Sequence, residues 1–194
     1  MRLKDSPSKG YLSMTSEQPG FVLWFTGLSG AGKTTLAVAL EPELKKRGIN
    51  VERLDGDIVR EGLTRDLGFS KEDRDKNIER VTFVAKLLSR NNVGVLASFI
   101  SPYRATRNMV REQVTNFIEV YVDVTLETAI ERDVKGLYQK ALAGEIPNFT
   151  GVSDPYEAPE DPEIVVETGQ QTLEESVAHI LHRLEELGMV PVPA

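Results

Sequence analysis

The sequence predicts an α/β protein of three layers, in which helices cover both faces of a five-stranded, mainly parallel sheet. Two observations carry this prediction. Short apolar runs of strand length alternate along the chain with longer segments whose apolar residues recur at helical spacing. The first apolar run, 21–26, also leads through a glycine-rich turn into a helix-like segment, which is typical of the first unit of such a fold.

The glycine-rich turn fits the phosphate-binding pattern G-x-x-x-x-G-K-[ST] without a mismatch. Glycines let successive backbone N–H groups point at phosphate oxygens, and the helix that follows adds its positive N-terminal end. A lysine at this position reaches the β- and γ-phosphates, and the next hydroxyl ligates Mg²⁺. We therefore predict a nucleoside triphosphate site formed by Gly27, Leu28, Ser29, Gly30, Ala31, Gly32, Lys33 and Thr34. The alternative is a plain strand-to-helix turn with a solvated lysine.

Composition narrows the class of protein. The 194 residues suit one domain at 20–190, preceded by a polar, flexible extension at 1–19. The sequence has no cysteine, no apolar run long enough for a membrane span and no apolar signal segment, so we expect a cytoplasmic protein without a membrane partner. The net charge is −7, yet 60–111 holds eleven Lys and Arg against six Asp and Glu. This basic region indicates a small anionic ligand rather than a nucleic acid polymer, although solvated helix faces account for part of it.

The second predicted strand, 49–54, follows a first helix that we expect to kink or restart at Pro42 and to end at Gly48. It leads into Asp55-Gly56-Asp57, which places two carboxylates at the ligand-binding edge of the sheet. Asp55 also suits a turn that caps the next helix. The third strand, 93–99, ends without an acidic residue, so a carboxylate for Mg²⁺ is expected at 55–57, and we assign it to Asp57.

The middle of the sequence contains capping and spacing patterns that predict two helices. Ser70 and Asp73 begin a helix whose apolar residues face the core, while Arg74 and Asn77 share another face near the site. After the third strand, Ser101 is expected to be the N-cap of a helix with Pro102 at its first position. Three arginines follow on one face of that helix: Arg104, Arg107 and Arg111.

The last third of the chain contains the predicted lid. A fourth strand at 117–122 precedes a helix from Thr125 to about Arg132, and a fifth strand spans 164–168. Between them, about 135–160 is rich in glycine and proline and poor in core-type residues, which favours a mobile lid. Thr172 and Glu175 form a capping box for the final helix, whose Leu173, Val177, Ile180, Leu184 and Leu187 are expected to pack on the sheet.

Taken in order, these motifs resemble adenylylsulfate kinase, a member of the P-loop kinase superfamily, over about 20–185. The resemblance rests on the phosphate loop 27–35, on Asp55-Gly56-Asp57 and its flanks, and on Asp66-Leu67-Gly68-Phe69-Ser70, Arg74-x-x-Asn77-Ile78, Phe99-Ile100-Ser101-Pro102, Lys135-Gly136-Leu137-Tyr138 and Phe149-Thr150-Gly151. It implies transfer of the γ-phosphate of ATP to the 3′-hydroxyl of adenosine 5′-phosphosulfate (APS), with Mg²⁺ as the cofactor of ATP.

The resemblance also implies site residues. The residues that match the family's acceptor-binding positions are Asp57, Arg60, Phe69, Arg74, Asn77, Ile100, Ser101, Lys135 and Phe149. Thr35, Arg132 and Thr168 join the phosphate loop as ATP-binding residues, and Thr34 and Asp57 are the metal positions. Lys33, Asp57 and Ser101 are the catalytic candidates. Ser101 matches the family's candidate for a phosphoserine intermediate, but we expect direct transfer because no base is evident beside it and it already has a capping role.

Two positions depart from the family pattern, and two other functions compete with it. Glu79 stands where the family has Arg, and Pro147-Asn148 replaces Lys-Gly, so acceptor affinity is the property expected to change. A shikimate- or gluconate-type kinase would share the phosphate loop but would not need Phe69 and Phe149. A GTPase-like switch is favoured only by Asp133-x-x-Gly136, which follows a helix instead of a strand. Dimers are common in the family, which implies a homodimer and a functional link to an ATP sulfurylase.

Overall fold

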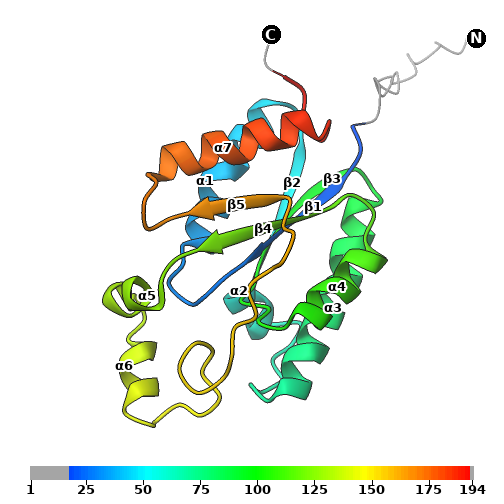
Figure 1. Cartoon of the computed structure of the whole chain (residues 1–194). Helices are drawn as coiled ribbons and strands as arrows, with labels where there is room; N and C mark the ends of the chain where they lie inside the picture. The colour runs from blue at the N-terminus through cyan, green and yellow to red at the C-terminus, as the bar shows by residue number, and fades with distance from the viewer. Residues whose placement is uncertain (1–17, 193–194) are drawn as a thin grey trace, which may run out of the picture.

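The computed structural model describes residues 18–192, and in this part of the chain five strands form one sheet in the order β2-β3-β1-β4-β5 (Figure 1). Every neighbouring pair of strands is parallel. The strands are β1 Phe21–Thr26, β2 Asn50–Asp55, β3 Val93–Ser98, β4 Phe117–Asp123 and β5 Ile164–Glu167. The predicted parallel α/β sheet is confirmed.

Helices cover both faces of the sheet, which completes the three layers (Figure 1). Helices α1 and α7 pack on one face, and α3 and α4 pack on the other. The helices are α1 Lys33–Lys46, α2 Gly56–Glu61, α3 Lys71–Ser89, α4 Arg104–Gln113, α5 Leu126–Arg132, α6 Leu137–Leu142 and α7 Leu173–Glu186. None of the helices described in residues 18–192 is long and apolar enough to cross a membrane.

The side-chain alternation of β1 divides the core. Phe21, Leu23 and Phe25 point toward α1 and α7, whereas Val22 and Trp24 point toward α3 and α4, and all five side chains are fully buried. A strand that is buried on both faces needs this continuous apolar sequence, because neither face meets water. The phosphate loop therefore follows a strand that is fully buried on both faces.

Local capping signals are confirmed at most helix ends. The side chains of Ser70, Thr125 and Thr172 each accept a hydrogen bond from the backbone at the start of α3, α5 and α7. Helix α1 continues through Pro42 without restarting. It ends in a Schellman motif, in which Gly48 has a φ of 80° and donates to Lys45, while the N–H of Ile49 donates to Leu44.

The prediction that Ser101 is a helix N-cap is wrong. Helix α4 begins at Arg104 with Tyr103 as its N-cap, and no side chain caps it. Ser101 instead has a φ of 39°, and its hydroxyl is hydrogen-bonded to Trp24 and Thr26 of β1. A buried indole N–H needs an acceptor, and this tertiary contact outweighs the local preference for a cap. At α7, Leu173 and Leu187 are also exposed instead of packed on the sheet.

The segment predicted as a lid, 135–160, is folded over the carboxyl ends of the strands and contains α6 (Figure 1). The prediction that this segment gains little from packing is wrong. Tyr138 and Phe149 are buried and meet edge to face, with ring centroids 5.0 Å apart. Tyr156 donates to or accepts from Thr26 at 2.9 Å and stacks on Tyr121. The mobility of this segment stays a prediction, and most of the predicted extension 1–19 lies outside the described residues.

Candidate active site

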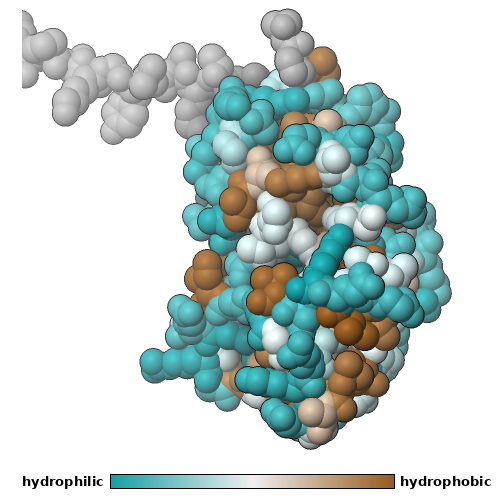
Figure 2. Space-filling model, turned by 90° about the vertical axis from the view of Figure 1, so that its left-hand side faces the viewer, coloured by the Kyte–Doolittle hydropathy of each residue, from teal (hydrophilic) through white to brown (hydrophobic). Residues whose placement is uncertain are grey.

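A cavity of about 820 Å³ opens at the edge of the sheet where the parallel strands end. The phosphate loop and α1, the start of α2, the N-terminal end of α3 and the segment 132–150 form its walls. The face of the molecule on this side is mostly hydrophilic, with hydrophobic side chains gathered in separate patches (Figure 2). In parallel α/β sheets this edge is where ligands bind, because loops from several strands meet there.

The phosphate loop has the backbone that phosphate binding requires. Gly27 has a φ of 151°, and a Cβ built on it would lie 2.4 Å from the carbonyl oxygen of Val122, so only glycine fits. Gly30 and Gly32 also have positive φ, and α1 begins directly after Gly32 with its N–H groups toward the cavity. The local sequence thus forms an anion site from backbone groups and a helix N-terminus.

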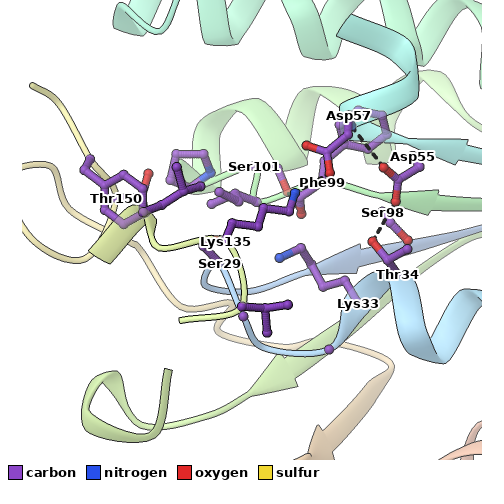
Figure 3. A pocket seen from close by; sticks show the side chains of 18 of the residues that line it. Ser29, Lys33, Thr34, Asp55, Asp57, Ser98, Phe99, Ser101, Lys135 and Thr150 are labelled. Atoms are coloured by element: carbon purple, nitrogen blue, oxygen red, sulfur yellow. Dashed lines mark hydrogen bonds and ion pairs between the residues drawn. The ribbon is translucent and has the colours of Figure 1, made fainter. Parts of the chain in front are cut away.

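Lys33 lies against this loop. Its ammonium donates hydrogen bonds to the carbonyl oxygens of Gly27, 3.0 Å away, and Leu28, 2.7 Å away. Burial lowers the pKa of Lys33 to about 8, and the positive charge of Lys135 adds to this effect. Figure 3 shows both ammonium groups pointing into the same part of the cavity. Two cations that face one space favour a highly charged anionic ligand there.

Asp55, the last residue of β2, and Asp57, in the first turn of α2, have different partners (Figure 3). Asp55 accepts a hydrogen bond from the Thr34 hydroxyl at 2.6 Å and another from the backbone of Asp57, so it caps α2 and contacts the phosphate loop. Asp57 is exposed and forms an ion pair with Lys135. The assignment of a metal role to Asp57 stays a prediction, but the carboxylate that contacts Thr34 is that of Asp55. Hydroxyl and carboxylate oxygens are the donors that Mg²⁺ prefers.

The donor set fits a nucleotide-bound Mg²⁺ rather than a metal held by protein alone. In residues 18–192 no three His, Cys, Asp or Glu side chains are grouped so that they could hold a metal ion. Mg²⁺ that binds with ATP needs few protein ligands, because phosphate oxygens and water complete its coordination. Thr34 and the neighbouring Asp55 supply what such a site requires.

The predicted acceptor residues line the opposite part of the cavity. Phe69 is 60% exposed, and the guanidinium of Arg60 lies 4.3 Å from its ring centroid. Arg74 donates to the carbonyl oxygen of Phe69 and to Thr150, so it joins α3 to the segment 135–160. Asn77 is buried, and its amide oxygen accepts from Thr64. Phe69 therefore offers an open aromatic face, which suits a planar ligand group.

Ser101 and Ile100 form the floor below these residues. The Ser101 hydroxyl is 3% exposed, accepts from the Trp24 indole at 3.0 Å and donates to Thr26 at 3.1 Å. The carbonyl oxygen of Ile100 accepts from Thr26. Within residues 18–192, no carboxylate, imidazole or amine is hydrogen-bonded to the Ser101 hydroxyl. This hydroxyl is a fixed part of the floor and lacks a base.

Arg132 and Thr168 hold the phosphate loop from the other side. Arg132 donates to the backbone and hydroxyl oxygens of Thr168, at 2.6 and 3.2 Å, and to the carbonyl oxygen of Gly30. The Thr168 hydroxyl donates to the carbonyl oxygen of Ala31 at 2.8 Å. Both predicted ATP-binding residues thus contact the loop that binds phosphate, next to the N-terminus of α1.

The basic region at 60–111 only partly faces the cavity. The three arginines of α4 pair instead with acidic residues outside that region: Arg104 with Glu160, Arg107 with Glu119, and Arg111 with Glu163. The cations that line the cavity are Lys33, Arg60, Arg74, Arg132 and Lys135. Three of these five come from outside the basic region. The excess of positive charge at 60–111 therefore did not predict which cations line the cavity.

The structure brings almost all the predicted residues to one cavity. Among the predicted site residues, Gly27, Leu28 and Ala31 do not line its wall and act through the loop backbone. Sequence reasoning missed Ser98, Tyr138 and Thr150, which do line it. Tyr138 lies inside the motif Lys135-Gly136-Leu137-Tyr138 and its hydroxyl donates to the carbonyl oxygen of Ser29 at 3.0 Å. Ser98 stands at the end of the third strand, a position where the sequence prediction considered acidic residues alone.

Comparison with known proteins now identifies the family. The adenylylsulphate kinase model matches residues 19–167. The chain belongs to the adenylylsulphate kinase family. A probable adenylyl-sulfate kinase of Pseudomonas aeruginosa is 77% identical over 86% of this chain and 78% of its own length. An adenylyl-sulfate kinase of Halothermothrix orenii is 58% identical over 91% of this chain and 95% of its own length.

Solved structures agree with membership of the adenylylsulphate kinase family. The APS kinase of Mycobacterium tuberculosis, in complex with AMPPNP and APS, superposes with a TM-score of 0.83 at 40% identity, covering 86% of this chain and 98% of that one. A gluconokinase of Sinorhizobium meliloti and the shikimate kinase of Aquifex aeolicus share only the fold, at 20% and 17% identity. The GTPase-like alternative has no support, because Asp133 ends α5 and follows no strand.

Proposed function

We propose that this protein is an ATP-dependent kinase that transfers the γ-phosphate of ATP to the 3′-hydroxyl of APS. The observation that carries the proposal is the cavity itself, in which a phosphate loop and an exposed aromatic side chain, Phe69, line one space together with five cationic side chains. ATP and a phosphosulfate acceptor together bring many negative charges to the reaction. Membership of the adenylylsulphate kinase family supports the acceptor.

On the donor side, the phosphate loop and Lys33 hold the phosphates of ATP. The N–H groups that follow Gly32 bind phosphate oxygens, and the Lys33 ammonium leaves its two backbone carbonyl partners for the β- and γ-phosphates. Thr34 and Asp55 would hold Mg²⁺, which would neutralise phosphate charge when it is bound with ATP. Arg132, at the end of α5, and Thr168, directly after β5, keep the loop in place.

On the acceptor side, Phe69 and Phe149 bind the adenine of APS, and Arg60, Arg74 and Lys135 face its anionic groups. Asp57 lies at the start of α2 beside Lys135, which makes it the candidate base for the 3′-hydroxyl proton. The ion pair holds the Lys135 ammonium beside the candidate base. When substrate binds, Lys135 can leave Asp57 and pair with an anionic group of the substrate. Phe149 is already packed against Tyr138, so its edge contact supports a preformed adenine site.

We infer that the phosphoryl group is transferred directly, without a phosphoserine intermediate. The Ser101 hydroxyl would have to lose its proton to a base in order to attack phosphorus. Its hydrogen-bond partners are an indole, a hydroxyl and, at 3.5 Å, the carbonyl oxygen of Phe99, and none of them takes up a proton at neutral pH. Ser101 therefore shapes the floor of the acceptor site, and the 3′-hydroxyl is the nucleophile.

A coupled assay of ADP release tests the proposed function. The enzyme is expected to release ADP only when ATP, Mg²⁺ and APS are all present, and Lys33→Ala is expected to remain folded and lose turnover. Gluconate and shikimate serve as competing acceptors. Turnover with either sugar-type acceptor but not with APS would overturn the proposal, as would a Lys33→Ala variant with normal activity.

Assembly and location are finer points of the same proposal. We expect a homodimer that works in the cytoplasm, where ATP is supplied, and that acts beside an ATP sulfurylase. A relative from Sorangium cellulosum is named a probable bifunctional SAT/APS kinase, and this chain matches 30% of its length at 59% identity. The APS kinase of Thiobacillus denitrificans is described as hexameric. Sedimentation analysis of the purified protein distinguishes a dimer from larger assemblies.

A further inference from the structure

The hydroxyl of Ser98 is unusual within residues 18–192, where it is the one buried side-chain polar atom without a hydrogen-bond partner. Ser98 is the last residue of β3, is 5% exposed, and lines the cavity. Buried hydroxyl groups in folded proteins are nearly always hydrogen-bonded. An unpaired one on the wall of a ligand cavity therefore indicates that a ligand supplies the missing partner.

The position of Ser98 indicates which part of the ligand this is. In the sheet, Ser98 is level with Phe25 of β1 on one side and with Asp55 of β2 on the other. Asp55 accepts the hydrogen bond from Thr34, the hydroxyl that follows the phosphate-loop lysine. Figure 3 shows Ser98 beside these two residues. The unpaired hydroxyl thus belongs to the Mg²⁺ end of the cavity rather than to the acceptor end.

This place in the sheet has a known use in proteins with a phosphate loop. Such proteins commonly place an aspartate at the end of a strand next to the phosphate loop, and its carboxylate holds the Mg²⁺ of the nucleotide. Here β3, the neighbour of β1, ends in Ser98, and the carboxylate comes from Asp55 on β2 instead. A serine cannot supply the charge, but its oxygen can accept a hydrogen bond from metal-bound water.

We propose that Ser98 positions the Mg²⁺ of bound MgATP by accepting a hydrogen bond from a water molecule of the metal's hydration shell. Mg²⁺ gives up its waters reluctantly, so groups that orient those waters help to fix the ion. Thr34 supplies an oxygen ligand, Asp55 supplies negative charge, and Ser98 orients a water molecule bound to the metal. The inference rests on the proposed function only in that the chain binds MgATP, and it does not depend on the acceptor.

The test measures binding of a non-hydrolysable ATP analogue by calorimetry, without acceptor, across a Mg²⁺ titration and in excess chelator. For Ser98→Ala, the Mg²⁺ concentration that half-saturates the enhancement of binding is expected to rise by roughly 10-fold, the lower end of the effect of removing a partner that orients a metal site. Binding in chelator is expected to stay unchanged. Ser98→Thr, which keeps the hydroxyl, is expected to bind as the wild type does.

Two controls make the outcome specific. Ser89→Ala removes another buried serine hydroxyl, on α3 and outside the cavity, and is expected to leave the Mg²⁺ dependence unchanged. The thermal midpoint of unliganded Ser98→Ala is expected to equal or exceed that of the wild type, because no hydrogen bond is lost. A lower midpoint would indicate a structural role and overturn the proposal.

Two binding outcomes would also overturn it. An unchanged Mg²⁺ dependence in Ser98→Ala would show that the hydroxyl does not act on the metal. An equal loss of affinity with Mg²⁺ and with chelator would show that it contacts phosphate directly. If the enzyme fails to phosphorylate APS while the Mg²⁺ effect is seen, the proposed acceptor is wrong and the role of Ser98 stands.

Discussion

Two aspartates separated by one glycine have different environments, and this difference separates their roles. Asp55 is buried, caps α2 and holds the Thr34 hydroxyl, whereas Asp57 is exposed and faces Lys135 across the cavity. A carboxylate that already accepts two hydrogen bonds is fixed in place and suits a structural or metal role. An exposed carboxylate whose cationic partner is also exposed can approach a substrate hydroxyl.

Asp57→Asn is expected to lower turnover by at least ~100-fold, because the amide keeps the shape but cannot take a proton. The Mg²⁺ dependence of turnover is expected to stay near that of the wild type. Asp55→Asn is the matched variant, and it is expected to raise the Mg²⁺ requirement instead. Steady-state assays of both variants across a Mg²⁺ titration check this assignment, and the opposite pattern would exchange the two roles.

The lowered pKa of Lys33, about 8, has a consequence for ATP binding. Phosphate favours the charged ammonium, so binding raises this pKa and draws a proton from solution above pH 8. ATP affinity is therefore expected to be level from pH 6.5 to about 8 and to fall at higher pH. Lys33→Arg keeps its charge throughout, so its profile is expected to be flat. Calorimetric titrations in buffers of different ionisation enthalpy measure the proton uptake, and its absence at pH 9 would contradict this prediction.

At the scale of elements, the lid segment divides into two parts with different contacts. The part around 154–158 is hydrogen-bonded to the first turns of α4, because Tyr103 donates to Asp154 and Arg107 donates to the carbonyl oxygen of Glu157. Most side chains of 142–148 are exposed, and this part precedes Phe149. Stability against local opening follows such contacts. The two parts are therefore expected to open independently.

Hydrogen exchange measures this difference. Without ligands, backbone amides of 142–148 are expected to exchange faster than those of 154–158, and APS with ADP is expected to slow the first group. Phe149→Ala is expected to abolish much of that slowing and to weaken APS binding by ~1–3 kcal/mol, the range for base–aromatic stacking. Leu142→Ala, an exposed position in the same segment, is the control. Equal exchange with and without ligands would show that 142–148 is not a lid.

Most of the elements could be predicted because their signals are local. Strand runs and caps such as Ser70 and Thr172 depend on residues within a turn or two of each other. The errors involve partners far apart in the chain. The Ser101 hydroxyl accepts from Trp24, 77 residues away, instead of capping a helix. Arg74 likewise donates to Thr150, 76 residues away. No periodicity or cap signal in the sequence encodes such contacts, because they depend on how the layers pack.

At the scale of the whole molecule, charge is distributed by folding rather than by position in the sequence. The arginines of α4 follow the acceptor motif directly, yet they face acidic residues of β4 and of the segment before β5. Arg107 is the most buried of them, at 2% exposed, and its side chain joins three parts of the fold. It donates to Glu119 at 2.6 Å, to the carbonyl oxygen of Ser101 at 2.6 Å, and to that of Glu157 at 2.7 Å.

Arg107→Met is therefore expected to destabilise the protein by ~3–5 kcal/mol, since it removes the shorter of the two ion pairs of the buried Glu119 and leaves it only Arg111, 3.3 Å away. The free energy of unfolding by urea measures this loss. Lys45→Met breaks the exposed ion pair with Glu41 and is expected to cost ~1 kcal/mol or less. Adding Glu119→Leu to Arg107→Met removes the stranded charge, and part of the lost stability is expected to return. A single variant as stable as the wild type would show that Arg111 alone compensates the charge of Glu119, and that the contacts of Arg107 with Ser101 and Glu157 do not stabilise the fold.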